Sequence, residues 1–532
     1  MTLINIENFN EKYPEIEKSI QQAKFIGVDL EFSALHPVKA PSLFDNPRER
    51  YSKLRANLSQ ITPIQIGIST FSFDPNNISY CGKIYNFYIL PAAFPTVHRS
   101  FYFQSDTLNF LKLYNFDFNE FVYLGIPFLN RQQEDALRLK LKSGDINENQ
   151  ICCKAELESL INSLNDVVTR WYNEAAEGDQ LPLPEIFDKY EYNFEMLYFI
   201  HKHFRRRLQH VWTAVENNEF VLKRVSEKEY RSLEKTDNLE EAIITDLLGF
   251  TKVFRLITSL RIPIVGHNLL QDILLMISSF ETSLPQSYAE FKKLANGLFP
   301  SIFDTKTISY ELKHMIPEEK IWADSSLESL FDYFKNGSGR HLVLNSPAVL
   351  LERDGNYGKF HEAGWDAYCA GYIFIRLAYL NVYHKFPKSK TFMSSELIGG
   401  LSHLKNRVNV IRGAVSSIKL DGEDPASTRP PFLVIESIRN KPVDISEVTS
   451  ILSSFGFVEV RKFPYHRKRA LIAVDNFYSA KRILANFKSH KEFQVKQYSA
   501  IKHSPFTQAI LLSGITMSGA ILFWFTQRYK TL

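Results

Sequence analysis

Residues 25–32 read FIGVDLEF, an apolar run that carries two acidic residues, Asp29 and Glu31. On a β-strand, residues i and i+2 point to the same face, so the two carboxylates are expected to emerge together. Acidic side chains within a buried strand are costly unless they are paired or bind a metal ion. A chain with 59 acidic residues also produces such pairs by chance. The stretch therefore predicts a strand of an α/β core that marks a candidate site.

A second acidic position follows another predicted strand. LRIPIVGH is a short apolar strand, and NLLQDILLMISSF is a helix with Asp272 about one turn from its start. Asp272 could face back towards the strand end, with His267 and Asn268 just before the helix. The alternative is that His267 and Asn268 cap the helix and Asp272 favours its N-terminal dipole.

A third motif has the spacing H-x-x-x-x-D. His361 and Asp366 lie in HEAGWD, and a long apolar helix follows. A histidine on the loop could approach an aspartate on the helix across the small residues between them. Considered alone, this motif is better explained by a capping or core histidine.

Residues 135–245 differ in composition from both neighbouring segments, being rich in Glu, Lys and Asn, and are interpreted as an inserted helical domain. Within it, HKHFRRRLQH places Arg206 and His210 four residues apart, which puts both side chains on one helical face. The Arg-x-x-x-His spacing is typical of a single-strand-binding motif. A solvated basic helix is the alternative interpretation.

The segment 416–431 is predicted to be a linker, and 432–500 a separate module with the order β-α-β-β-α-β. This order is that of an RNA recognition motif or of the wider ferredoxin-like fold. The strand RKRALIAVDN has no aromatic residue for base stacking, although Arg467, Lys468 and Arg469 could hold phosphates. A structural module is the alternative.

Residues 506–526 contain no charged residue. As a helix they would extend about 31 Å, the thickness of a bilayer's hydrocarbon core. We therefore predict a transmembrane tail anchor over 505–527, with a buried C-terminal helix as the alternative.

Composition restricts the class of protein. The 532 residues suffice for about three domains, and the net charge of +4 does not by itself indicate a nucleic-acid partner. The four cysteines form no C-x-x-C pair, which argues against a zinc ribbon or a disulfide scaffold and favours a reducing compartment.

Taken together, the ordered motifs D-x-E, D and H-x-x-x-x-D resemble the DEDDh class of 3′-to-5′ exonucleases. The surrounding sequence is similar to the poly(A)-specific ribonuclease family over nearly all of residues 1–410. The similar stretches are DLEFSAL, QIGISTF, DFNEFVYLGIPFLN, GHNLLQD, FDTK and HEAGWDAY. Because of the predicted anchor, the chain most resembles the membrane-anchored subgroup that shortens precursors of PIWI-interacting RNAs.

The resemblance implies an α/β, RNase H-like nuclease core with a mixed sheet, formed by 1–134 and 246–415 around the insertion. Asp29, Glu31, Asp272 and Asp366 would hold two Mg²⁺ ions, with Mn²⁺ as an alternative, and His361 would act as general base. His267, Asn268, Arg206 and His210 are weaker candidates for RNA contacts.

The implied partners are single-stranded RNA 3′ ends, the lipid bilayer, a Tudor-domain scaffold, a PIWI protein and a second copy of the chain. The implied location is the mitochondrial outer membrane, with the endoplasmic reticulum as the alternative. Two other functions stay open at this point: an anchored poly(A) deadenylase and a non-catalytic RNA-binding scaffold.

Overall fold

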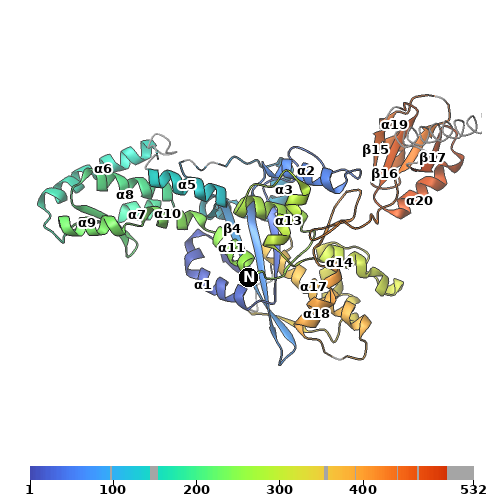
Figure 1. Ribbon diagram of the computed structural model, residues 1–532, viewed down its shortest axis with the longest axis horizontal. Helices are drawn as coiled ribbons and strands as arrows, with labels where there is room; N and C mark the ends of the chain where they lie inside the picture. The colour runs from blue at the N-terminus through green and yellow to red at the C-terminus, as the bar shows by residue number, and fades with distance from the viewer. Residues whose placement is uncertain are drawn as a thin grey trace, which may run out of the picture. The chain divides into compact units, whose positions relative to one another are not determined.

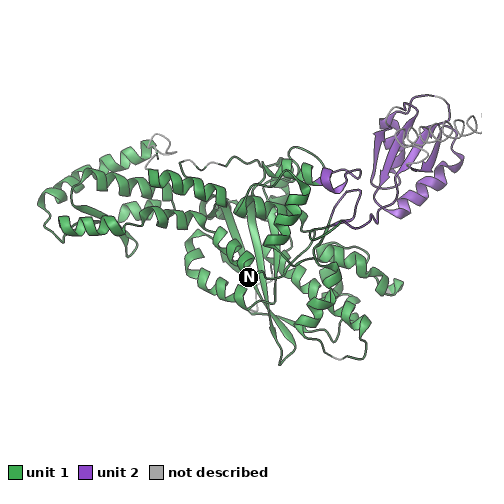
Figure 2. Ribbon diagram, viewed as in Figure 1, with its two compact units in different colours: residues 1–40, 51–409, 419–423 green, residues 41–50, 410–418, 424–532 purple. Residues whose placement is uncertain are grey.

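Figure 1 shows the computed structural model, which describes residues 1–499 except 96, 98, 144–145, 147–153, 353–357, 390, 440 and 464–465. The chain divides into two compact units (Figure 2). Unit 1 contains residues 1–40, 51–409 and 419–423, and unit 2 contains residues 41–50, 410–418 and those from 424 onward.

The core of unit 1 is an eight-stranded mixed sheet. Its main path has the order β1-β4-β3-β2-β9-β10, and β5 and β11 also pair with β4. The strands are β1 (Thr2–Ile4), β2 (Phe25–Phe32), β3 (Pro63–Asp74), β4 (Ser79–Pro91), β5 (Ile126–Phe128), β9 (Ile264–Gly266), β10 (Ile302–Asp304) and β11 (Ala348–Leu351). β2 lies between antiparallel β3 and parallel β9. The predicted α/β class with a mixed sheet is confirmed.

Helix α17 (Ala363–Lys385) covers one face of this sheet and packs against β2, β3 and β4. Every residue from Ala363 to Val382 is buried, which is why the helix sequence is apolar almost all round. The other helices around the sheet are α1 (Ile6–Gln22), α2 (Pro47–Leu58), α3 (Ser105–Leu113), α4 (Phe118–Leu124), α11 (Thr251–Leu260), α12 (Leu270–Met276), the π-helix η2 (Ile277–Glu281), α13 (Tyr288–Leu298), α14 (Thr305–Leu312), α15 (Leu327–Lys335), α16 (Gly339–Leu342) and α18 (Ser394–Gly400), with short 3₁₀ turns η3 (Lys313–Met315), η4 (Glu318–Lys320) and η5 (Ser402–Leu404).

The segment between β5 and α11 has a hydrophobic cluster made mainly of its own residues. Its elements are α5 (Arg131–Ser143), α6 (Lys154–Glu174), β6 (Gln180–Leu183), α7 (Pro184–Tyr190), α8 (Phe194–Arg207), β7 (Val211–Glu216), β8 (Glu219–Arg224), α9 (Glu227–Thr236) and α10 (Leu239–Leu248). The insertion, predicted to be helical, consists mainly of helices and also contains a three-stranded sheet in the order β6-β8-β7. The β7–β8 hairpin turns at Asn217 and Asn218, both with left-handed φ values (51° and 62°), as such two-residue turns require.

Unit 2 contains a four-stranded antiparallel sheet in the order β15-β16-β14-β17. Its elements are β14 (Leu433–Ser437), α19 (Ile445–Ser453), β15 (Val458–Lys462), β16 (Arg469–Val474), α20 (Phe477–Asn486), η6 (Phe487–Ser489) and β17 (Phe493–Gln497). This is the predicted β-α-β-β-α-β order. Before it, β12 (Arg407–Asn409) pairs with β13 (Ser417–Lys419).

Among the described residues, no helix has the length and hydropathy needed to cross a bilayer. The predicted anchor at 505–527 lies outside the described part of the chain.

Candidate functional site

The acidic pair of β2 lies in the middle of the sheet. Asp29 is opposite Gly67 and Glu31 is opposite Gln65 on β3, and the pairing becomes irregular directly after Glu31. Both carboxylates are repelled by Asp366 of α17. They therefore share the face of β2 that α17 covers.

Two glycines allow α17 to come close enough to the sheet for this contact. A Cβ atom at Gly67 would lie 1.8 Å from the carbonyl oxygen of Ala363, and one at Gly27 would lie 2.1 Å from that of Ala367. Any larger residue would push the helix away. The small residues of β2 and β3 thus set the distance between Asp366 and the strand carboxylates.

Two buried side chains of the sheet hold the N-terminus of α17. Oε1 of Gln65 accepts a hydrogen bond from the backbone N–H of Ala363 at 2.9 Å. Oδ1 of Asn86 accepts one from the N–H of Gly364, also at 2.9 Å. The first N–H groups of a helix lack partners within the helix, so these bonds fix the turn that carries Asp366.

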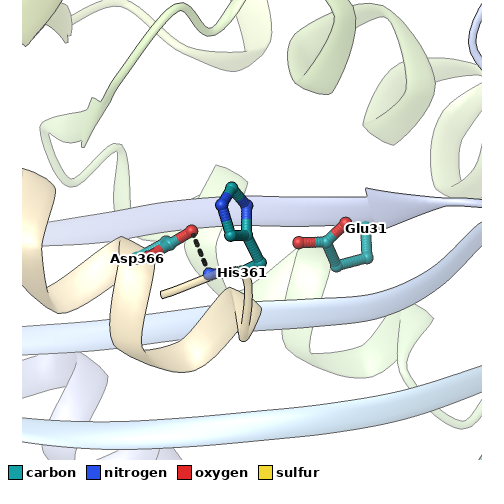
Figure 3. Close-up of side chains that lie close together, drawn as sticks. All are labelled: Glu31, His361 and Asp366. Atoms are coloured by element: carbon teal, nitrogen blue, oxygen red, sulfur yellow. Dashed lines mark hydrogen bonds between the residues drawn. The ribbon is translucent and has the colours of Figure 1, made fainter. Parts of the chain in front are cut away.

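His361 lies just before α17 in a left-handed backbone conformation, with φ of 67°. Its backbone N–H donates to Oδ2 of Asp366 at 3.1 Å (Figure 3). One ligand atom each from Glu31, His361 and Asp366 lies within 4.8 Å of the others. The fold thus brings residues from β2, a loop and α17 to one point.

The imidazole of His361 packs against aromatic rings from the segment after β4. Its centroid lies 3.9 Å from that of Tyr114 and 4.9 Å from that of Phe110. Burial lowers the pKa of His361, and the nearby carboxylate of Glu328 acts in the opposite direction. A lowered pKa keeps the imidazole neutral at pH 7, in the form that accepts a proton.

Asp272 reaches the cluster from the first turn of α12 and is only 6% exposed. Asp29 and Glu31 are both repelled by it. Hydrogen bonds from its own backbone and from that of Leu30 on β2 act to lower its pKa. The fourth carboxylate is thereby tied to the strand that carries the first two.

Asp304, at the end of β10, organises the loop that leads to Asp272. This carboxylate is fully buried and accepts the backbone N–H groups of Asn268 and Leu269, each at 3.1 Å. It also accepts those of Lys306, Thr307 and Asn409. One side chain therefore joins the starts of α12 and α14 to β12.

The four clustered carboxylates destabilise one another's charged forms. Burial, followed by repulsion from Asp366 and Asp272, raises the pKa of both Asp29 and Glu31 well above the usual range. Asp29 and Glu31 keep part of their surface accessible, but the surrounding protein still removes much of their hydration. Burial raises the pKa of Asp272 and of Asp366 to about 7.

The cluster fits a divalent cation. Within the described residues, no ion pair joins any of the four carboxylates to a lysine or arginine, and Oδ1 of Asp366 is buried without a hydrogen-bond partner. Mg²⁺ and Mn²⁺ prefer carboxylate oxygens. A bound cation would supply the missing positive charge and lower the raised pKa values.

Two predicted RNA-contacting residues, His267 and Asn268, are engaged within the protein. Nδ1 of His267 lies 2.9 Å from Oγ1 of Thr305, and burial lowers the pKa of His267 to about 3. Oδ1 of Asn268 accepts a hydrogen bond from Asn409 at 2.7 Å. These contacts support the loop before Asp272.

The prediction that Arg206 and His210 lie on one helical face was wrong. Helix α8 ends at Arg207, the following Leu208 is extended, and His210 has a left-handed φ of 56°. The chain must leave the helix here because β7 begins at Val211. His210 instead lies beside Tyr230 of α9, with ring centroids 6.2 Å apart.

Sequence reasoning missed three residues that position the cluster: Gln65, Asn86 and Asp304. Each is a buried polar residue on an apolar strand, with an exposed fraction of 2% or less. That signal was visible in QIGISTF, KIYNFYIL and FDTK. The partners through which these residues position α12 and α17, however, lie 35 or more residues away in sequence.

Comparison with known proteins agrees with this geometry. Residues 4–374 match the model of the CAF1 family ribonucleases. The pre-piRNA 3′-exonuclease trimmer of Bombyx mori is 31% identical, with 99% of both chains covered. The mouse poly(A)-specific ribonuclease PNLDC1 is 27% identical, covering 94% of both chains. The Xenopus laevis poly(A)-specific ribonuclease PARN is 26% identical, covering 86% of this chain and 74% of the relative.

The family match covers more than half of the chain, and the similarity to the Bombyx mori protein extends over almost all of it. Within the matched range lie both strand carboxylates, the carboxylate of α12, and the His361–Asp366 pair. The chain therefore belongs to the CAF1 ribonuclease family and is a 3′-to-5′ exoribonuclease.

Proposed function

We propose that this exoribonuclease trims the 3′ ends of single-stranded RNA, with precursors of PIWI-interacting RNAs as its substrates. The observation that carries the chemistry is the convergence of four carboxylates and His361 at the N-terminus of α17. The substrate class rests on the similarity to the Bombyx mori trimmer over 99% of the chain.

Asp29, Glu31, Asp272 and Asp366 would hold two divalent cations, Mg²⁺ or Mn²⁺. Bound at such a site, two cations supply an activated water and stabilise the leaving 3′ oxygen. Asp29 is repelled by each of the other three carboxylates, which supports its inclusion among the residues that would hold the cations. His361 would accept the proton of the attacking water, because burial lowers its pKa and so favours the neutral ring. The ring also lies beside Glu31 and Asp366 and packs against Tyr114.

Membrane attachment belongs to the same proposal. A tail anchor at 505–527 would place the enzyme on the mitochondrial outer membrane, or on the endoplasmic reticulum, with its catalytic region in the cytosol. A Tudor-domain scaffold and a PIWI protein would then present the RNA. The uncharged run 506–526 supports the anchor.

An anchored poly(A) deadenylase is the second candidate, favoured by the similarity to the two poly(A)-specific ribonucleases. The two functions differ in base preference. Purified chain ending at His503 would be incubated with 5′-labelled RNAs that end in mixed sequence or in oligo(A). Each reaction would contain Mg²⁺ or EDTA, with Glu31→Gln as the control.

Trimming predicts stepwise shortening of both RNAs, lost with EDTA and with Glu31→Gln. Shortening confined to oligo(A) would instead establish the deadenylase. If neither RNA is shortened, the assay is repeated with PIWI-bound RNA on membranes. Continued inactivity there would contradict both candidates.

A further inference from the structure

The helices α19 and α20 cover one face of the sheet of unit 2; the opposite face, turned away from them, is called the open face here. Leu433, Ile435, Ile472 and Val474 pack with α19 and α20 in a single hydrophobic cluster. Because side chains alternate along a strand, their neighbours point the other way. The open face of the sheet is therefore formed by Val434, Glu436, Glu459, Arg461, Arg469, Leu471, Ala473, Gln494 and Lys496.

This open face lacks the chemistry that single-stranded RNA needs. Sheets of this topology bind bases by stacking them on aromatic side chains of the central strands. Here the central strands β14 and β16 present Val434, Leu471 and Ala473 instead. Arg469 is already paired with Glu436 at 3.0 Å.

The charges of the open face nearly cancel among the described residues. Its two arginines, Arg461 and Arg469, are matched by the carboxylates of Glu436 and Glu459. Phosphate binding depends on a local excess of cations. Lys496 of β17 is the single excess cation among the described residues of this face. One lysine gives only a weak local attraction, so the described strands offer neither stacking rings nor a row of cations for the phosphates.

A segment of the chain itself occupies the open face at β15. Glu459 accepts two hydrogen bonds, from Oγ of Ser42 at 2.5 Å and from the backbone N–H of Leu43 at 3.0 Å. Arg461 donates to Oγ of Ser42 at 2.9 Å and lies 4.5 Å from the ring centroid of Phe44. A cation above an aromatic ring is itself attractive, so Phe44 sits where a base would otherwise stack on the arginine.

Residues 41–50 belong to unit 2 (Figure 2) and are braced for this contact. Leu43 and Asp45 are 3% and 2% exposed. Arg50 donates to Asp45 at 3.2 Å, to the carbonyl of Ser42 at 3.0 Å and to that of Ile411 at 2.7 Å. The hydrogen bonds of Arg50 therefore fix the conformation of the segment, in addition to the hydrogen bonds that join it to Glu459.

We propose that the open face of this module is an intramolecular docking site for residues 42–44, and that single-stranded RNA does not bind there. The module thus ties residues 41–50, which follow the catalytic strand in sequence, to the C-terminal part of the chain. The β-α-β-β-α-β module therefore binds a segment of its own chain.

The first test uses hydrogen–deuterium exchange of the full chain, followed in peptides covering residues 41–46. Glu459→Ala should raise exchange there about tenfold, because it removes two hydrogen bonds to a charged group. Ser42→Ala should act in the same direction, and the double variant should add little to Glu459→Ala. Lys462→Ala, an exposed position on the same strand, is the control. Unchanged exchange in Glu459→Ala would overturn the docking site.

The second test asks whether RNA uses the face. In a Glu31→Gln background that prevents cleavage, the affinity for a mixed-sequence single-stranded RNA should change less than about twofold in Arg461→Ala. RNA should leave the exchange of residues 41–46 and 458–473 unaltered. Protection of 458–473 by RNA, release of 41–46, or a tenfold loss of affinity in Arg461→Ala would each overturn the proposal.

Discussion

At the scale of single residues, the site is built from groups that repel one another. Asp29, Glu31, Asp272 and Asp366 all have raised pKa values. The cluster is held together despite this repulsion, because Gln65, Asn86 and Asp304 accept hydrogen bonds from the helix ends and loops that carry the carboxylates. Carboxylates held this close together are expected where a cation binds, because the attraction between the cation and the carboxylates offsets their mutual repulsion.

Neutralising one carboxylate should separate activity from stability. Asp366→Asn is expected to lower the cleavage rate about 10³-fold or more, because several kcal/mol of metal-dependent stabilisation is lost. Without metal ions the same variant should melt at an equal or higher temperature than the parent, since one repelling charge is removed. Rates and melting temperatures in EDTA are the measurements. Glu362→Gln, beside the cluster, is the matched control, and a parent-like rate in Asp366→Asn would contradict the site.

Removing the imidazole should affect chemistry more than metal binding. His361→Gln is expected to reduce the rate at saturating RNA by about 10² to 10⁴-fold, the usual contribution of a general base. The Mg²⁺ concentration at half-maximal rate should change little, because the four carboxylates are intact. Rate against Mg²⁺ concentration measures both quantities. A rate within threefold of the parent would show that another group takes the proton.

Asp304→Asn tests a positioning residue. The amide retains one acceptor oxygen, but it cannot accept all five backbone N–H groups now bound. We expect a rise of about 10 to 100-fold in the Mg²⁺ concentration for half-maximal rate, as for other supporting residues of metal sites. High Mg²⁺ should restore much of the rate. An unaltered Mg²⁺ dependence would remove Asp304 from the site's support.

At the scale of elements, the close packing of α17 on β3 requires a residue without a Cβ atom at position 67. Gly67→Ala places a Cβ atom 1.8 Å from a backbone carbonyl oxygen and is expected to destabilise the protein by about 3 kcal/mol or more. Gly297→Ala, in helix α13 with no atom within 4 Å, should be neutral or stabilising by up to about 1 kcal/mol. Urea unfolding of both variants measures the difference. Equal stability of the two would refute the close approach.

Local pattern was enough to predict part of these elements. The apolar run with acidic residues in FIGVDLEF correctly predicted β2, and the apolar run after HEAGWD correctly predicted α17. Both predictions succeeded because the pattern of apolar residues in a short stretch reflects which sides of the element are buried. The spacing could not reveal that Arg206 and His210 do not share a helical face, because α8 ends at Arg207 where the chain turns into the β7–β8 hairpin. The supporting bonds of Gln65 and Asn86 depend on contacts between residues nearly 300 positions apart. The predicted domain boundaries and the anchor stay predictions.

At the scale of the whole molecule, pH acts on the carboxylate cluster and on the insertion in opposite directions. Burial lowers the pKa of His201 on α8 to about 3, so folding favours its neutral form. The unfolded chain binds a proton below about pH 6.5, and stability from this group is therefore lost as pH falls through that value. The raised carboxyl pKa values have the opposite effect.

A variant isolates the histidine's contribution. Between pH 7.5 and pH 5 the parent should lose roughly 2 kcal/mol through His201, a loss absent in His201→Gln. Urea midpoints followed by tryptophan fluorescence can measure this, since Trp212 lies beneath Arg205 in the same domain. Parallel pH dependences for parent and variant would show that His201 is not held neutral.

The central claim is that the four carboxylates form a two-cation centre, and counting bound ions tests it most directly. Mn²⁺ would be titrated into the full chain and followed by electron paramagnetic resonance, with a single-stranded RNA whose 3′-terminal linkage resists hydrolysis. We predict two Mn²⁺ ions per chain, and loss of both in Asp29→Asn, because Asp29 adjoins all three other carboxylates. Binding that is no greater in the parent than in Asp29→Asn would contradict the account.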